Sequence, residues 1–186
     1  MGTKNIFFKY FFIILITTTS CSLFSDDDGC SDDQNDSRPI TVEGLLEITP
    51  LNTEYNQGDI IEVTLTLPSA NNFFSTPVDL FDETGTIESW IEGFDHTELT
   101  AENTITLESG RLENNGRAYV IYNEDNNDYE LIYRVTLERT GTYEILVSPS
   151  YRLRFPTNNA CDFEVETSLN GFSTEEITNF TFEVTP

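Results

Sequence analysis

The sequence has few basic residues, one histidine and three cysteines, and each shortage excludes a class of function. Nine Lys and Arg stand against 33 Asp and Glu in 186 residues, which gives a formal net charge of −24 at pH 7. Nucleic-acid binding is excluded, because it depends on Lys and Arg side chains that neutralise phosphates. A zinc ribbon is excluded as well, because no two Cys form a Cys-x-x-Cys pair and His96 is the only histidine.

The sequence also lacks the motifs of several enzyme classes. It contains no Gly-x-Ser-x-Gly, no His-Glu-x-x-His and no phosphate-binding glycine loop. His96 follows Asp95 and is expected to be an exposed loop residue. A carboxylate pair for glycoside hydrolysis stays open as an alternative, although nothing selects two of the 33 acids. The chain is therefore predicted not to be an enzyme.

The N-terminal region has the layout of an export signal. Both lysines, Lys4 and Lys9, precede an apolar run from Tyr10 to Ile16, which small residues separate from Cys21. The run is about a third of the ~20 residues that a membrane-spanning helix needs. We therefore expect cleavage after residue 20. An ordinary signal peptide with a chance cysteine at its end is the alternative.

The residues before Cys21 resemble the lipobox of bacterial lipoproteins, with Thr19 and Ser20 as the small residues and Thr18 where that family prefers Leu. The resemblance implies that Cys21 carries a diacylglycerol and, after cleavage, an acylated amino group. Two or three acyl chains make a durable anchor, at ~0.8 kcal/mol per buried CH2. The expected location is the outer membrane, with the protein facing the periplasm or the cell exterior.

Residues 21–39 are predicted to be a disordered acidic tether, because residues 25–36 contain six acids and almost no apolar side chain. The stretch Ser25-Asp26-Asp27-Asp28 resembles the acidic tag of surface-exported Bacteroidota lipoproteins, and this resemblance implies display on the cell surface. A plain acidic linker is the alternative. Cleavage would remove both lysines, so that the positive charge of the mature chain would come from arginine. Such an excess of acidic residues is typical of highly soluble proteins and of proteins adapted to salt.

If Cys21 is acylated, Cys30 and Cys161 remain as an even pair in an oxidising compartment. We expect a disulfide between them, closing a loop of about 130 residues. The alternative is two thiols, because Cys30 lies in the predicted tether.

Residues 40–186 are predicted to form one β domain. Apolar residues recur there at every second position in short runs, as in half-buried strands, and turn residues separate the runs. In residues 60–67, for example, Ile61, Val63, Leu65 and Leu67 point one way. Further runs with this pattern lie at residues 40–49, 78–81, 87–94, 104–108, 118–123, 129–137, 143–147, 151–155, 161–169 and 180–184. Asn115-Gly116 predicts a tight hairpin, and residues 124–128 a five-residue loop. This spacing favours a two-sheet antiparallel sandwich.

The segment Leu137–Val147 resembles the corner between strands E and F of immunoglobulin-like domains, through Gly141-Thr142-Tyr143. The resemblance implies that the Tyr143 hydroxyl bonds back to the upstream backbone. Ile145 stands where antibody domains have a cysteine, which points to the bacterial immunoglobulin-like or fibronectin-III-like group. Trp90 is a candidate for the core tryptophan of such a domain.

Two kinds of ligand site are considered. A sugar-stacking platform would need outward-facing aromatic rings, and the candidates are Trp90, Tyr119, Tyr122 and Tyr151. The alternative is that these rings belong to the core, in which case they form no platform. A Ca2+ site is considered at Asp125, Asn127 and Asp128, where the alternative is a solvated loop. Arg152 and Arg154 are expected to pair with cross-strand Glu. No other cofactor is expected.

The sequence thus predicts a lipid-anchored, non-catalytic β-sandwich with a binding or structural role. Its expected partners are the membrane, through the N-terminal lipid, and a protein or glycan of unknown identity. The second hypothesis is a carbohydrate-binding accessory module of a surface glycan-uptake system.

Overall fold

The computed structural model describes residues 37–157, 161–172 and 176–186, and these form an all-β body. The strands and two short helices are, in chain order, β1 (Ser37–Thr41), β2 (Leu46–Thr49), β3 (Glu54–Asn56), β4 (Ile60–Pro68), β5 (Ala70–Asn71), β6 (Val78–Asp79), α1 (Leu80–Thr84), β7 (Glu88–Trp90), α2 (Thr97–Thr100), β8 (Thr104–Ser109), β9 (Arg111–Leu112), β10 (Ala118–Asn123), β11 (Asp128–Thr136), β12 (Gly141–Val147), β13 (Tyr151–Phe155), β14 (Asp162–Thr167) and β15 (Thr178–Thr185).

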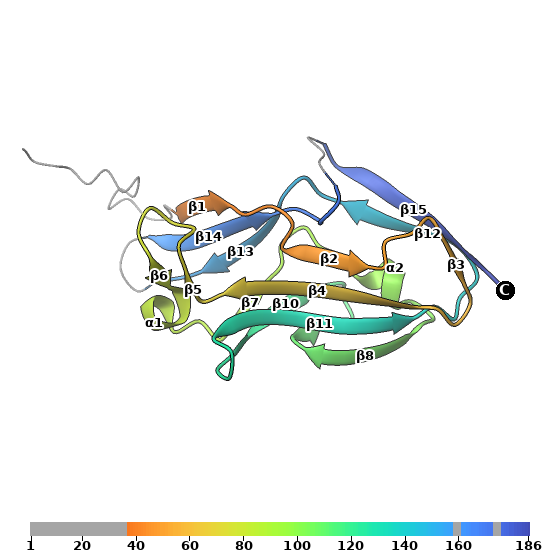
Figure 1. The fold of residues 1–186 in the computed structure, drawn as a ribbon, viewed down its shortest axis with the longest axis horizontal. Helices are drawn as coiled ribbons and strands as arrows, with labels where there is room; N and C mark the ends of the chain where they lie inside the picture. The colour runs from red at the N-terminus through yellow and green to blue at the C-terminus, as the bar shows by residue number, and fades with distance from the viewer. Residues whose placement is uncertain (1–36, 158–160, 173–175) are drawn as a thin grey trace, which may run out of the picture.

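The strands form one large and three small sheets. The large sheet has the order β2-β4-β11-β10-β7, with β8 beside β11 and β9 beside β10. Two three-stranded sheets, β1-β14-β13 and β12-β15-β3, lie above it in Figure 1. A common apolar core fills the space between the layers; for example, the Tyr129 ring of β11 lies 4.7 Å from the Phe155 ring of β13. This layering is consistent with the predicted β-sandwich.

The predicted inward faces are confirmed by burial. Ile61, Val63, Leu65 and Leu67 of β4 are all fully buried, because strand alternation turns them toward the opposite layer. The same holds for the inward residues predicted on β11, β12 and β14, which are Tyr129, Leu131, Tyr133, Val135, Tyr143, Ile145, Val147, Phe163 and Val165. The hairpin at Asn115-Gly116 is also confirmed, since β9 and β10 pair antiparallel on either side of it.

Three predictions about the strands were wrong. Residues 40–49 form two strands in different sheets, because Gly44 has a φ of +73° and the hydroxyls of Ser168 and Thr167 accept the N–H groups of Gly44 and Leu45. Only the first half of residues 78–81 is a strand, β6, because the Asp79 carboxylate caps α1, which begins at Leu80. The pairing is also not wholly antiparallel, since β1 runs parallel to β14 and β3 parallel to β15.

The corner between β11 and β12 has the hydrogen bond that its sequence implied. The Tyr143 hydroxyl lies 2.9 Å from the Arg139 carbonyl oxygen and donates to it, and it also lies 3.0 Å from the Asn103 side-chain oxygen. The Tyr143 ring is fully buried and stacks on Phe182 of the neighbouring strand, with centroids 4.7 Å apart. The bond therefore fixes the point where the chain passes from the large sheet to the sheet of β12.

Tyr133 provides a matched comparison for Tyr143. Its ring is also fully buried, but its hydroxyl has no hydrogen-bond partner within the described residues. We predict that Tyr143→Phe lowers the free energy of unfolding by about 1 kcal/mol, because it removes a satisfied buried bond. Tyr133→Phe is expected to leave stability unchanged or to raise it, since an unsatisfied polar group is removed. Urea unfolding of both variants measures this, and equal losses would contradict it.

Candidate functional site

The structure brings together two of the four predicted platform residues and separates the other two. Trp90 on β7 and Tyr119 on β10 are direct cross-strand neighbours on the outward face of the large sheet. Tyr151 is fully buried, and its hydroxyl accepts the N–H of Ser148. Tyr122 stacks on Phe81, with ring centroids 3.9 Å apart. A four-residue sugar platform is therefore not present, and only Trp90 and Tyr119 share a face.

Two arginines complete this outward face, and we call Arg111, Tyr119, Trp90 and Arg117 the arginine–aromatic cluster. The Arg111 guanidinium carbon lies 3.7 Å from the centre of the Tyr119 ring, and that of Arg117 lies 4.5 Å from the centre of the Trp90 ring. Both distances are within the range of cation–π attraction. Arg111 is directly opposite Tyr119 across β9 and β10, so a row of side chains runs over three strands.

The two arginines differ in what else they contact. Arg111 binds both carboxylate oxygens of Glu88, at 2.9 and 3.2 Å, and also pairs with Glu113. The hydrogen bond from Arg111 lowers the pKa of Glu113, and the same contacts raise the pKa of Arg111. Arg117 is exposed and has no ion pair among the described residues. Arg117 and Trp90, which is 38% exposed, therefore form the accessible end of the cluster.

The arginines of the cluster were not identified from the sequence. Asn115-Gly116 predicted a hairpin, but a two-residue turn there would place Arg111 opposite Val120. In the structure Glu113 and Arg117 face each other across a three-residue loop, and this puts Arg111 opposite Tyr119. The contact of Arg117 with Trp90 joins two segments that are distant in the sequence, so no local pattern indicates it.

Arg152 and Arg154 do pair with cross-strand Glu, as predicted. Their Nε atoms each lie 3.1 Å from a carboxylate oxygen of Glu164, and Arg152 also approaches Glu166 and Glu92. Glu164 is 5% exposed, so the two guanidinium groups compensate a buried carboxylate. This arrangement is structural support for the β13–β14 hairpin.

The loop considered for Ca2+ is organised by its own hydrogen bonds. The Asn127 side chain donates to Asp79 at 3.1 Å and accepts from the Tyr122 hydroxyl at 2.7 Å, so both of its polar atoms have partners. Burial raises the pKa of Asp128, and the nearby charge of Glu130 raises it further. In the described part of the chain, no three His, Cys, Asp or Glu are grouped closely enough to hold a metal ion. A Ca2+ site at Asp125, Asn127 and Asp128 stays a prediction.

The predictions about the cysteines concern one residue within the described part of the chain and two residues outside it. Cys161 is 6% exposed and comes directly before β14, whereas Cys21 and Cys30 lie outside the described residues. The lipidation of Cys21 and the pairing of Cys30 with Cys161 both stay predictions.

The expectation for His96 was wrong, because its side chain is 4% exposed. The neighbouring helix α2 holds it: Nδ1 of the ring lies 3.1 Å from the Thr100 hydroxyl. His96 is one of the residues that line a cavity of about 500 Å3 between β8, β9 and α2.

No protein-family model matches the chain, and no curated protein or solved structure is detectably similar to it. Among the helices of the described residues, none is long and apolar enough to cross a membrane.

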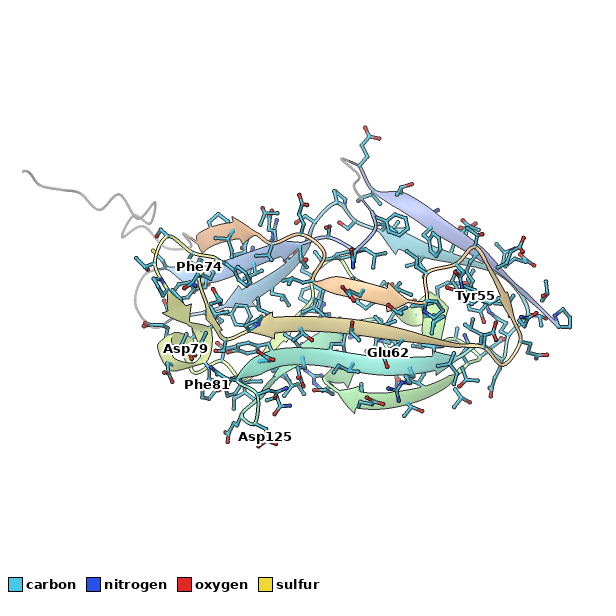
Figure 2. All side chains as sticks on the ribbon, in the orientation of Figure 1. Tyr55, Glu62, Phe74, Asp79, Phe81 and Asp125 are labelled. Atoms are coloured by element: carbon cyan, nitrogen blue, oxygen red, sulfur yellow. The ribbon has the colours of Figure 1, made fainter. Side chains whose placement is uncertain are left out.

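The Asp79 carboxylate connects three segments near this loop (Figure 2). One of its oxygens accepts from the Ser69 hydroxyl at 2.7 Å and from the Phe81 and Asp82 amides, while the other accepts from Asn127. Burial alone would raise the pKa of Asp79, but the hydrogen bonds from Ser69, Asn127 and the two amides lower it below its ordinary value.

We predict that Asp79→Ala lowers the free energy of unfolding by about 1 kcal/mol at pH 6, the usual cost of losing a helix cap. The pKa of Asp79 is lower in the folded chain than in the unfolded chain, where it is ~3.9. The ionised carboxylate therefore stabilises the fold fully above pH ~3.9, and this contribution is lost as the pH falls through the pKa of the folded state. The difference between the variant and the wild type should therefore shrink between pH 6 and pH 3 in urea unfolding. Asp82→Ala removes an adjacent exposed carboxylate that accepts no hydrogen bond from the described part of the chain, and it is the control. A pH-independent difference for Asp79→Ala would contradict the prediction.

Proposed function

We propose that the chain is a lipid-anchored, extracytoplasmic binding protein without catalytic activity, held at the outer membrane and facing the periplasm or the cell exterior. The export signal, the lipobox-like residues before Cys21 and the acidic tag at Ser25–Asp28 support the anchor. The β body then acts as the ligand-presenting part. No described cluster of side chains favours catalysis over binding.

An immunoglobulin-like arrangement of the body is part of this proposal. The pairs β2–β4 and β4–β11 correspond to the order A-B-E of one sheet of such a domain, and the antiparallel pair β12–β15 corresponds to strands F and G. The Tyr143 corner bond between β11 and β12 supports the same assignment. In domains of this type the loops and sheet faces are the surfaces that vary to bind partners.

The observation that supports a binding role most directly is the exposed end of the arginine–aromatic cluster. The fold buries most of its aromatic rings, yet Trp90 stays 38% exposed beside Tyr119 and in contact with the exposed Arg117. Trp, Tyr and Arg are the side chains that dominate binding energy at protein interfaces. A partner that offers a flat apolar group next to a hydrogen-bond acceptor fits this surface.

The parallel pairing of β1 with β14 supports the predicted disulfide. Ser37 is the register partner of Asp162, so the residue after Cys161 lies beside the first residue of β1. Cys30 precedes Ser37 by seven residues, a length that spans up to about 25 Å when fully extended. A disulfide between Cys30 and Cys161 is therefore compatible with the observed pairing of β1 with β14.

The anchor and the disulfide are tested together by the intact mass of the protein extracted in detergent from its native host. We expect the mass of residues 21–186 plus acyl groups, with two thiols that react with a labelling reagent only after reduction. A soluble, unacylated chain cut elsewhere would contradict the anchor. Thiols that react without reduction would contradict the disulfide.

The second candidate function is carbohydrate binding in a surface glycan-uptake system, and the adjacent rings of Trp90 and Tyr119 favour it. Sugar rings stack on exposed aromatic faces, and Arg117 would add donors for ring hydroxyls or carboxylates. Trp90 is the only tryptophan, so its fluorescence reports on this surface alone.

We predict that, if a polysaccharide is bound, Trp90→Ala and Arg117→Ala each weaken retention on it by at least tenfold. Phe73→Ala removes another exposed aromatic ring, 40% exposed, and is the matched control that should retain binding. Retention on a panel of insoluble polysaccharides and quenching of Trp90 fluorescence measure this. Absence of retention on every glycan, or equal losses in all three variants, would argue against the carbohydrate hypothesis and leave a protein partner.

A further inference from the structure

β8 forms an edge of the large sheet, because β11 is the only strand that it pairs with among those the structure describes (Figure 1). The direction of its main chain follows from the hydrogen bonds of β11. Leu137, next to the end of β11, exchanges two main-chain hydrogen bonds with the turn that precedes β4, at 2.7 and 2.9 Å. Strand alternation therefore turns Thr136 and Arg134 the other way, toward their register partners Thr104 and Thr106 on β8.

Ile105 and Leu107 of β8 consequently direct their main-chain N–H and C=O groups away from β11, toward the open side of the sheet. None of these four groups has a hydrogen-bond partner within residues 37–157, 161–172 and 176–186. A main-chain group without a partner in the protein must be satisfied by water or by a ligand. The edge thus presents two donors and two acceptors at alternate residues, which is the pattern that a further strand pairs with.

Other sheet edges in the described part of the chain are blocked or closed. On β1, Val42 donates its N–H to β14, so alternation turns Pro39 to the open side, where it offers no N–H. The edges of β7 and β13 are joined, because the Ser89 hydroxyl donates to the Arg154 carbonyl and accepts the Arg154 N–H. Natural sheets protect their edges by such devices. The register shift of β8 comes only after Leu107, so the regular part of β8 stays open.

The cavity of about 500 Å3 between β8, β9 and α2 adjoins this edge. It lies where the chain reverses at Gly110, whose φ of +88° favours glycine and where a Cβ would lie 2.7 Å from the Tyr119 carbonyl oxygen. β8 and β9 leave this turn as partners of different strands, β11 and β10. Ile105, Leu107 and Leu112 line the cavity, and Leu107 is 46% exposed. The side chains of a strand added to β8 would alternate between this cavity and the outer face of the sheet.

We propose that the open edge of β8 binds an extended segment of a partner protein in which apolar residues alternate with Lys or Arg. The segment would add to the large sheet as a further strand, with its main chain bonded to Ile105 and Leu107. Its apolar side chains would enter the cavity. Its basic side chains would lie on the outer face, where Thr104, Thr106 and Glu108 are exposed and where the net charge of −24 on the whole chain attracts them.

The main chain of β8 decides between this occupant and others. A small molecule meets only part of a row of donors and acceptors that recurs along a strand, whereas an extended chain presents the complementary row. A second copy of the chain is disfavoured, because both copies carry the same large negative charge. The site is on β8, whereas the arginine–aromatic cluster belongs to β7 and the β9–β10 hairpin. Failure of one therefore does not imply failure of the other, and the proposal does not depend on the lipid anchor.

Synthetic peptides test the proposal on the folded chain by fluorescence anisotropy. The probe is Lys-Val-Lys-Val-Lys-Val-Lys with blocked ends, and two variants of the same charge carry main-chain N-methyl groups either on the valines or on the inner lysines. Each variant blocks one edge of the peptide, so we expect one to bind like the parent and the other at least tenfold more weakly. The weak one shows whether the added strand is antiparallel or parallel. Equal effects of the two methylations, no binding of the parent, or equal binding of the corresponding Glu-Val peptide would overturn the proposal.

Hydrogen exchange measured by NMR locates the bound peptide. The amides of Ile105 and Leu107 should exchange rapidly in the free chain and at least tenfold more slowly when the parent peptide is bound. The amides of Thr104 and Thr106, which face β11, should exchange slowly in both states. Unchanged exchange at Ile105 and Leu107 with saturating peptide would refute the proposed edge.

Variants separate the main chain of β8 from the cavity beside it. Ile105→Pro removes an open-edge N–H and leaves the bonds to β11 in place, so the chain should stay folded and bind the peptide at least tenfold more weakly. Leu107→Ser should weaken binding about tenfold, whereas Leu146→Ser, at an equally exposed leucine of β12, should retain it. Equal losses in the two serine variants would contradict the site. Should Ile105→Pro not fold, the exchange at Leu107 and the serine pair decide the question.

Discussion

The antiparallel ladder between β4 and β11 is the interaction on which the rest of the fold depends. It joins nine residue pairs, from Ile60 with Thr136 to Pro68 with Asp128, and it places two fully alternating strands at the centre of the large sheet. β2 adds to the outer side of β4, and β8 and β10 share the other side of β11. Every inward side chain of this pair from Ile61 to Leu67 and from Tyr129 to Val135 is buried, so a shift of one residue would expose the whole set. The core thus fixes the register, and the register fixes where each loop begins.

The strong negative charge is accommodated by using the few arginines as local partners for carboxylates. Arg134 on β11 lies between Glu62 of β4 and Glu108 of β8, at 2.7 and 2.5 Å. Arg139 pairs with Glu98 and lies over the Tyr143 ring, which links α2 to the corner between β11 and β12. Exposed pairs of this kind contribute little energy individually. The pairs between cross-strand neighbours reduce repulsion where acidic strands meet. The exposed Arg117, which has no ion pair within the described residues, is an exception to this use of arginine.

Local sequence was sufficient for most of the fold and for little of the site. The alternation of β4, β11 and β12 is visible in the sequence because each strand is half buried along its whole length. The interruption at Gly44 and the helix at Asp79 were missed, because side chains distant in the sequence, Thr167 and Ser168 in one case and Ser69 in the other, stabilise those bends. His96 was assigned to the surface for the same reason: an isolated histidine between acids has no periodic signal, and its burial depends on the hairpin that packs against it.

The hairpin of β9 and β10 separates the arginine–aromatic cluster on one face from the cavity on the other. Its outward residues, Arg111 and Tyr119, belong to the arginine–aromatic cluster, and its inward residue Leu112 lines the cavity. The tip of the hairpin is held against the segment that carries His96, because the Gly116 carbonyl accepts the His96 N–H at 3.4 Å. Gly116 has a φ of +87°, which favours glycine, and a Cβ there would lie 2.5 Å from a carboxylate oxygen of Asp95. One short hairpin, held at its tip by the contact with His96 and at its start by the turn at Gly110, thus contributes side chains to both surfaces.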